Sequence, residues 1–129
     1  MMDDNIRVIQ FFIKEGRSEK CVLDSINSLL TYPIRSTDFD VPNSSGFLLL
    51  NNYTNGFKQG ICISLVCDMA SEINEEDFIK KLANILNTDI LLQIDDDEEN
   101  PWALAFPNNP VLEKVYVDFL DDGVDIRKD

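Results

Sequence analysis

The chain has 129 residues, no histidine, and a net charge of −13 from 24 acidic and 11 basic side chains. The lack of histidine excludes Ser-His-Asp and Cys-His catalysis, most zinc sites and any histidine-based pH switch. A hydrophobic content of 44% predicts a single folded domain over residues 1–129, and is too high for a disordered acidic tail.

No apolar stretch is long enough to span a bilayer, and the first four residues, MMDD, are acidic where a signal peptide would be basic. The three cysteines, Cys21, Cys62 and Cys67, form an odd set without CxxC spacing. Such cysteines are typical of small buried side chains in a reducing compartment. We therefore expect a cytoplasmic protein that makes no contact with a membrane.

The first elements of the chain predict a strand followed by a helix. Residues 6–13 are apolar and rich in β-branched and aromatic side chains, which favours a strand. Ser18 is a candidate N-cap for a helix with an apolar stripe at helical spacing. That helix should end near Tyr32, because the residue before Pro33 is disfavoured in helical geometry.

A loop and a hairpin come next. Residues 33–46 are rich in Pro, Ser, Asn and Asp and predict a long loop. Residues 47–53 and 61–67 predict two antiparallel strands, and the Asn55-Gly56 pair marks the turn between them.

The remaining elements alternate in the same way. Asn74 is a candidate N-cap for a second helix over 74–87, whose buried stripe we expect to consist of Phe78, Leu82, Ile85 and Leu86. Residues 90–94, 102–106 and 115–120 predict three strands, and the residues after them are polar and read as a frayed end.

The element order predicts an α+β fold with a ferredoxin-like βαββαβ core, two helices packed on its sheet, and two antiparallel C-terminal strands that extend or cap it. The strand directions in such a core bring residues 68–77, 95–101 and 121–125 to one end of the sheet. These segments hold three acidic clusters without a basic residue among them.

The negative charge is concentrated in the second half of the chain. Residues 68–129 contain 17 acidic and 5 basic residues, a net charge of −12, whereas residues 1–67 contain 7 and 6, a net charge of −1. Such a field repels nucleic acid and attracts a basic protein surface. The residues expected to contact this partner are Asp95, Asp96, Asp97, Glu98, Glu99, Trp102, Tyr116, Asp118, Asp121, Asp122 and Asp125, with Glu72, Glu75, Glu76 and Asp77 as a second group.

The acid clusters at 95–99 and 118–125, with the adjacent Trp102 and the α+β element order, resemble the immunity proteins of bacterial polymorphic-toxin systems, particularly those of contact-dependent growth inhibition. The resemblance implies a small, cytoplasmic, non-catalytic protein without metal or cofactor. Its partner would be a basic toxin, often a nuclease, carried as the C-terminal domain of a secreted effector. The resemblance assigns no individual residue.

Two other functions remain open at this point. A small-ligand-binding or regulatory domain on a ferredoxin-like scaffold predicts an apolar pocket. A carboxylate-based, metal-dependent enzyme predicts two or three acids within metal-ligand distance, although neither acidic run fits an EF-hand loop.

Each candidate residue also has a purely structural interpretation. Trp102 and Tyr116 could pack the sheet, the acidic run could be a solvated turn, and Glu75, Glu76 and Asp77 suit a helix N-terminus.

Overall fold

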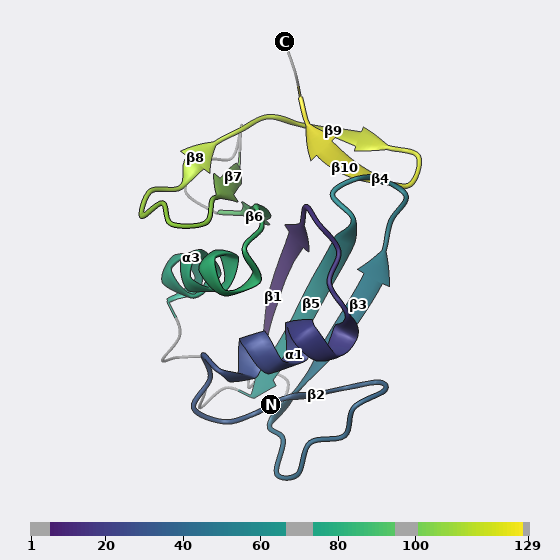
Figure 1. The fold of residues 1–129 in the computed structure, drawn as a ribbon, viewed down its shortest axis with the longest axis vertical. Helices are drawn as coiled ribbons and strands as arrows, with labels where there is room; N and C mark the ends of the chain where they lie inside the picture. Colours follow the sequence, from purple (N-terminus) through teal and green to yellow (C-terminus); the bar gives the residue numbers. More distant parts are fainter. Residues whose placement is uncertain (1–5, 67–73, 95–100, 128–129) are drawn as a thin grey trace.

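The computed structural model describes residues 6–66, 74–94 and 101–127, and in these ranges the chain forms an α+β fold with two helices and two sheets (Figure 1). None of the helices in this part of the chain is long and apolar enough to cross a bilayer. The elements are β1 (Ile6–Ile13), α1 (Glu19–Asn27), β2 (Arg35–Ser36), β3 (Gly46–Asn52), β4 (Asn55–Gly56), β5 (Gln59–Val66), α3 (Glu75–Leu86), β6 (Ile90–Gln93), β7 (Trp102–Ala105), β8 (Glu113–Lys114), β9 (Val117–Leu120) and β10 (Gly123–Ile126).

The larger sheet is mostly antiparallel. Its strands lie in the order β2-β3-β5-β1-β6-β7-β8, and only the short edge pair β2–β3 is parallel. Alternate residues of a strand point to opposite faces, so Ile9, Phe11 and Ile13 of β1 lie on one face. Both helices cover that face and form the main core with it, which includes Ile26 of α1 and Leu82 of α3.

Local capping explains where the helices begin. Ser18 accepts a hydrogen bond from the backbone N–H of Cys21 at 3.1 Å, and Asn74 accepts one from Asp77 at 3.0 Å, so both predicted N-caps are confirmed. Asn87 ends α3 in the left-handed conformation at φ 54°. These caps satisfy N–H and C=O groups that a helix end leaves without partners.

Two details of the helices differ from the prediction. The first helix ends at Asn27 and not near Tyr32. The side-chain amide of Asn27 donates a hydrogen bond to the backbone oxygen of Ile34 at 3.0 Å and accepts one from the backbone N–H of Ile34 at 2.9 Å. These two bonds turn the chain back at the end of the helix. Ile85, expected in the buried stripe of α3, is about half exposed, and Ile79 is buried in its place.

Of the two C-terminal strands expected to extend or cap the main sheet, one extends it and the other forms part of a cap. The strand over 102–106 extends the sheet as β7, but the segment after Val115 leaves the sheet. β9 pairs with β10, formed by residues expected to be frayed, and β10 pairs in parallel with β4. The resulting sheet, β4-β10-β9, caps one end of the molecule in Figure 1.

A second hydrophobic core holds this cap in place. It lies on the face of the main sheet opposite the helices, and its buried members are Phe57, Leu91, Leu104, Val115, Val117 and Val124. The apolar residues among 115–126 are therefore sufficient to bury a strand pair, which explains why this segment is ordered although acidic residues surround it.

Two glycines allow β10 to approach β4. A Cβ at Gly123 would lie 2.1 Å from the carbonyl oxygen of Asn55, and one at Gly56 would lie 2.1 Å from that of Val124. Both glycines also have positive φ, at 144° and 68°. The hairpin turn of β3 and β5 thus serves as the docking site of the C-terminal strands.

The acidic clusters were expected to meet at one end of the sheet, and the position of the cap shows that this prediction is wrong for residues 121–125 and the start of α3. Residues 121–125 lie beside β4, at the end of the sheet where β5 begins. Glu75 contacts Arg7 at 3.4 Å, and Arg7 pairs with Leu65 at the end of β5, so α3 begins at the opposite end. Residues 68–73 and 95–100 lie outside the described residues.

Candidate protein-binding surface

The C-terminal hairpin combines exposed apolar side chains with carboxylates. Phe119 is 73% exposed, Tyr116 60% and Leu120 40%. Exposed aspartates are adjacent to Phe119 and Leu120 in the chain, and Asp118 lies two residues after Tyr116. We call this set the C-terminal acidic surface; it consists of Tyr116, Asp118, Phe119, Leu120, Asp121 and Asp125.

The strand register explains how the surface is presented. Val117 and Val124 point inward and are buried in the second core, so Asp118 and Asp125 project from the other face of the hairpin. These two aspartates are direct cross-strand partners. Like charges opposite each other are unfavourable in a sheet, and Arg127 offsets the repulsion through a 3.0 Å contact between its Nε and the Asp118 carboxylate.

Asp122 has a structural role that separates it from the other aspartates. Its carboxylate accepts hydrogen bonds from the hydroxyl of Thr54 at 2.7 Å and from the backbone N–H of Thr54 at 2.9 Å. These two bonds, the hydroxyl bond first, hold the pKa of the Asp122 carboxyl below its usual value. Asp122 therefore joins the hairpin turn to the cap and is not free to contact a partner.

Trp102 connects the C-terminal hairpin to the main sheet through other aromatic rings. Its ring centroid lies 6.0 Å from that of Phe119, edge-on, and 6.2 Å from that of Phe12. Phe12 in turn lies 6.2 Å from Tyr53. Trp102 is half-buried, so packing accounts for most of its contacts, while Phe119 at the end of the row is largely exposed.

The acids of α3 lie apart from this surface. Glu75 pairs with Arg7, and Asp77 pairs with Lys81 at 3.2 Å one helical turn later, so the first turn of α3 is partly neutralised. Glu76 is exposed. Of the other predicted contact residues, Glu72 and the acidic run 95–99 lie outside the described residues. The structure thus brings together Trp102, Tyr116, Asp118, Asp121, Asp122 and Asp125, and places Glu75, Glu76 and Asp77 elsewhere.

A second exposed surface was not foreseen from the sequence. The part of the main sheet that neither helices nor cap cover, here called the open face, is formed by Val8, Gln10 and Phe12 of β1, Phe47, Leu49 and Asn51 of β3 with Tyr53, and Gly60, Cys62 and Ser64 of β5. Val8 is 52% exposed and Leu49 is 49% exposed. The alternation of the strands was visible in the sequence, but which face the helices cover was not.

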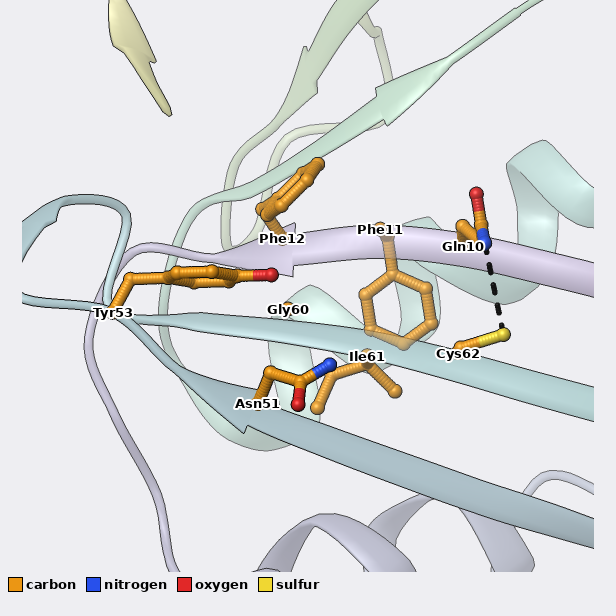
Figure 2. A pocket seen from close by; sticks show the side chains of 8 residues that line it. All are labelled: Gln10, Phe11, Phe12, Asn51, Tyr53, Gly60, Ile61 and Cys62. Atoms are coloured by element: carbon orange, nitrogen blue, oxygen red, sulfur yellow. Dashed lines mark hydrogen bonds between the residues drawn. The ribbon is translucent and has the colours of Figure 1, made fainter. Parts of the chain in front are cut away.

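The open face has a hollow beside Gly60, where a Cβ would lie only 2.8 Å from the Tyr53 ring, so the aromatic rings pack directly over this glycine. The hollow has a volume of about 130 Å³, and the rings of Tyr53 and Phe12 lie beside it (Figure 2). Gln10 donates a weak hydrogen bond to the Cys62 sulfur across its floor, at 3.7 Å. Cys62 is half-buried here, and Cys21 is exposed on α1.

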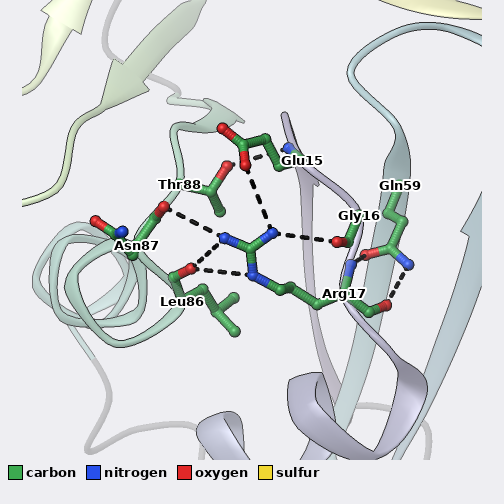
Figure 3. A network of polar contacts seen from close by, with 7 residues as sticks. All are labelled: Glu15, Gly16, Arg17, Gln59, Leu86, Asn87 and Thr88. Atoms are coloured by element: carbon green, nitrogen blue, oxygen red, sulfur yellow. Dashed lines mark hydrogen bonds and ion pairs between the residues drawn. The ribbon is translucent and has the colours of Figure 1, made fainter.

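Arg17 organises a polar cluster that sequence reasoning also missed. Its guanidinium donates to the backbone oxygen of Leu86 from Nε at 3.2 Å and from Nη2 at 2.7 Å, and so satisfies the C-terminal end of α3 (Figure 3). Gln59, a buried polar residue, bonds to the backbone N–H and C=O of Arg17. This cluster ties α3 to the segment after β1 and has a structural role.

Within residues 6–66, 74–94 and 101–127, no three acidic or cysteine side chains are arranged to hold a metal ion. The described residues present two exposed surfaces, one with carboxylates and aromatic side chains, the other without carboxylates. Comparisons of the chain with protein-family models, curated proteins and solved structures gave no match.

Proposed function

We propose that the chain is a non-catalytic immunity protein that binds a basic toxin in the cytoplasm and neutralises it through the C-terminal acidic surface. The observation that carries the proposal is that one small hairpin exposes three apolar side chains together with aspartates: Leu120 shares the outer face with Asp118, Tyr116 precedes them, and Phe119 is exposed on the other face beside Trp102. Apolar anchors surrounded by charge are the usual composition of a specific protein interface.

The electrostatics favour a basic partner. A chain with a net charge of −13 attracts cationic surfaces over several ångströms and repels phosphate. Asp118, Asp121 and Asp125 would pair with lysine or arginine side chains that a nuclease uses to bind its substrate. A mismatched partner would leave these carboxylates desolvated without a counter-charge, which provides specificity.

The scaffold is consistent with a binding role. We propose that β3, β5, β1 and β6, which lie in this order and pair antiparallel, form a ferredoxin-like core with α1 and α3, to which β7, β8 and the C-terminal cap are added. The cap rests on backbone pairing with β4 and on a core of its own. It therefore presents the C-terminal acidic surface on a fixed support, which lowers the ordering cost of binding.

The test uses toxin domains of secreted proteins whose genes lie next to the gene for this chain. Stopped-flow mixing gives the association rate constant of each complex, and a separate measurement gives its dissociation rate constant. The triple variant Asp118→Asn, Asp121→Asn, Asp125→Asn should associate about ten-fold or more slowly at low salt. Phe119→Ala should instead mainly speed dissociation, because it removes an anchor.

The matched control neutralises three exposed acids elsewhere, with Asp24→Asn, Asp38→Asn and Asp40→Asn on α1 and the loop before β3. It changes the total charge by the same amount. If the control slows association as much as the first triple variant, net charge alone attracts the partner and the C-terminal hairpin is not the contact surface.

A further inference from the structure

The open face has a charge composition unlike the rest of the molecule. None of its ten residues is acidic, although the chain contains 24 acids. Arg35 lies at its border, with its guanidinium 4.9 Å above the Phe47 ring. An antiparallel sheet face that contacts only water normally carries polar side chains, whereas Val8 and Leu49 are exposed here.

We infer that the open face is the contact surface between two copies of this chain. Each copy carries a net charge of −13, so two copies can approach closely only through a surface without carboxylates. The outer sides of α1, α3 and the C-terminal hairpin all carry exposed acids, including Asp24, Glu76 and Asp118. On the main sheet, Glu113 of β8 lies three strands away from β1.

The surface shape of the open face is compatible with the packing of one sheet on another. Its middle row is Gln10, Cys62 and Leu49, its outer rows carry Val8 and Phe12, and all are aligned by the strand register. The 130 Å³ hollow at Gly60 lies at one end, and a larger one of about 330 Å³, beside Phe47 and Arg35, lies at the other. The apolar side chains of a second copy can fill these hollows.

The position of Cys62 makes the contact measurable. It lies in the middle row of the middle strand, so it is the centre of the open face. Facing sheets pack about 10 Å apart, and their inward side chains interdigitate. Two copies in face-to-face contact would therefore bring their Cys62 thiols within reach of a short cross-linker.

The size of the surface sets the expected affinity. Three strands spanning six residues cover only about 15 by 20 Å, which is small for a permanent dimer. We expect a reversible dimer with a dissociation constant of roughly 10 μM to 1 mM.

Sedimentation equilibrium across this concentration range tests the inference. Leu49→Asp and Gln10→Glu each place a carboxylate on the open face, the second with little change in shape, and both should weaken the dimer at least ten-fold. Val111→Asp changes an exposed apolar residue outside the open face and should leave the dimer intact. A monomer mass for the wild-type chain at every concentration, or a dimer that both open-face variants retain, overturns the inference.

Cross-linking gives an independent readout. One variant keeps Cys62 alone, with Cys21→Ser and Cys67→Ser, and the matched variant keeps Cys21 alone, with Cys62→Ser and Cys67→Ser. If solvent exposure alone decided the reaction, a short bismaleimide would join two copies more readily through Cys21, which is exposed, than through Cys62, which is half-buried. Dimerisation through the open face reverses this order, and a higher yield through Cys21 contradicts it.

The dimer proposed here does not depend on the proposed toxin complex, and the two contacts should respond to salt in opposite ways. Screening reduces repulsion between two copies, so self-association should strengthen between low and physiological ionic strength. Binding of a basic partner to the C-terminal acidic surface should weaken over the same range. A dimer that weakens with salt would be held by ion pairs and not by the open face.

Discussion

Thr54 and Asp122 join two segments that are 68 residues apart in the chain, through hydrogen bonds to one carboxylate. The charged form of Asp122 is the better acceptor, which is why its pKa lies below the usual value. A group whose pKa is lower in the folded state stabilises the fold above its unfolded-state pKa, and loses that contribution as the pH falls through the folded-state value.

We therefore expect the contact between the cap and the hairpin turn to weaken below about pH 4, the usual aspartate range. Amide NMR shifts of Thr54 and Asn55 should titrate with the Asp122 carboxyl. In Asp122→Asn the Thr54 shift should no longer follow pH in this range. A Thr54 amide that titrates identically in Asp122→Asn would show that another group is responsible.

Arg17 illustrates a residue whose geometry matters more than its charge. Its planar guanidinium donates two hydrogen bonds to one carbonyl at the end of α3, a geometry that a lysine cannot reproduce. Arg17→Lys should lower the free energy of unfolding by about 1–3 kcal/mol. Urea denaturation measures this loss.

The control for Arg17 is Arg35→Lys, because Arg35 is exposed and its described contact is with the Phe47 ring. Its effect should stay within about 0.5 kcal/mol. Equal losses in both variants would mean that the contacts of Arg17 with α3 contribute no specific stability.

Leu82 shows how much the main core depends on single side chains. It is fully buried between α3 and the sheet, so Leu82→Ala should cost about 2–5 kcal/mol. Ile85→Ala on the exposed side of the same helix should cost less than about 1 kcal/mol. Thermal and urea unfolding of the two variants check the difference, and similar losses would contradict the orientation of α3.

At the scale of the elements, the contact between β4 and β10 depends on the absence of two side chains. Gly123→Ala would place a methyl group against the carbonyl oxygen of Asn55, in a backbone conformation that favours glycine. We expect it to destabilise the cap by more than about 1 kcal/mol. Hydrogen exchange should then show lower protection at the amide of Phe57, which donates to Val124.

The control is Gly16→Ala, where the added methyl group would lie 3.6 Å from the nearest side-chain atom, at an ordinary contact distance. This variant should retain wild-type exchange at Phe57. Unchanged protection at Phe57 in Gly123→Ala would show that β10 is held without close approach to β4.

The sequence was informative about elements with local signals and uninformative about contacts between distant ones. The N-caps Ser18 and Asn74 predicted the two helices correctly, and the β-branched and aromatic content of β1 predicted a strand correctly. The strand predicted over 115–120 is present as β9, but its partner β10 was not predicted, because the burial of Val124 depends on residues such as Phe57 and Leu91 from other parts of the chain. The end of the first helix was predicted too late in the chain, because the hydrogen bonds between Asn27 and Ile34 could not be predicted from helical periodicity.

The candidate site was predictable in part for the same reason. The sequence identified Tyr116 and the aspartates of 118–125, which the structure places together, but it did not identify Phe119 or Leu120 as contact residues. It could not show that Asp122 is engaged by Thr54, or that residues 121–125 lie at the opposite end of the sheet from Glu75. The open face also depends on which side of the sheet both helices cover, and each helix alone is compatible with either side.

At the scale of the whole molecule, the net charge of −13 opposes the compact state, because folding brings carboxylates closer together. The ion pairs that the structure describes, such as Lys20–Asp24 and Lys81–Asp77, are exposed and contribute little to stability. Repulsion should therefore outweigh attraction, and added salt should stabilise the fold by screening it.

We expect the urea midpoint of the wild-type chain to rise steadily between about 20 mM and 500 mM sodium chloride, where the Debye length falls from roughly 20 Å to about 4 Å. The triple variant Asp24→Asn, Asp38→Asn, Asp40→Asn should have a higher midpoint at low salt and a smaller rise, because part of the repulsion is already removed. Measurements at low micromolar protein concentration keep self-association from contributing. A urea midpoint that falls with added salt would mean that attraction within ion pairs outweighs repulsion between carboxylates, so that the excess of acids does not destabilise the folded chain.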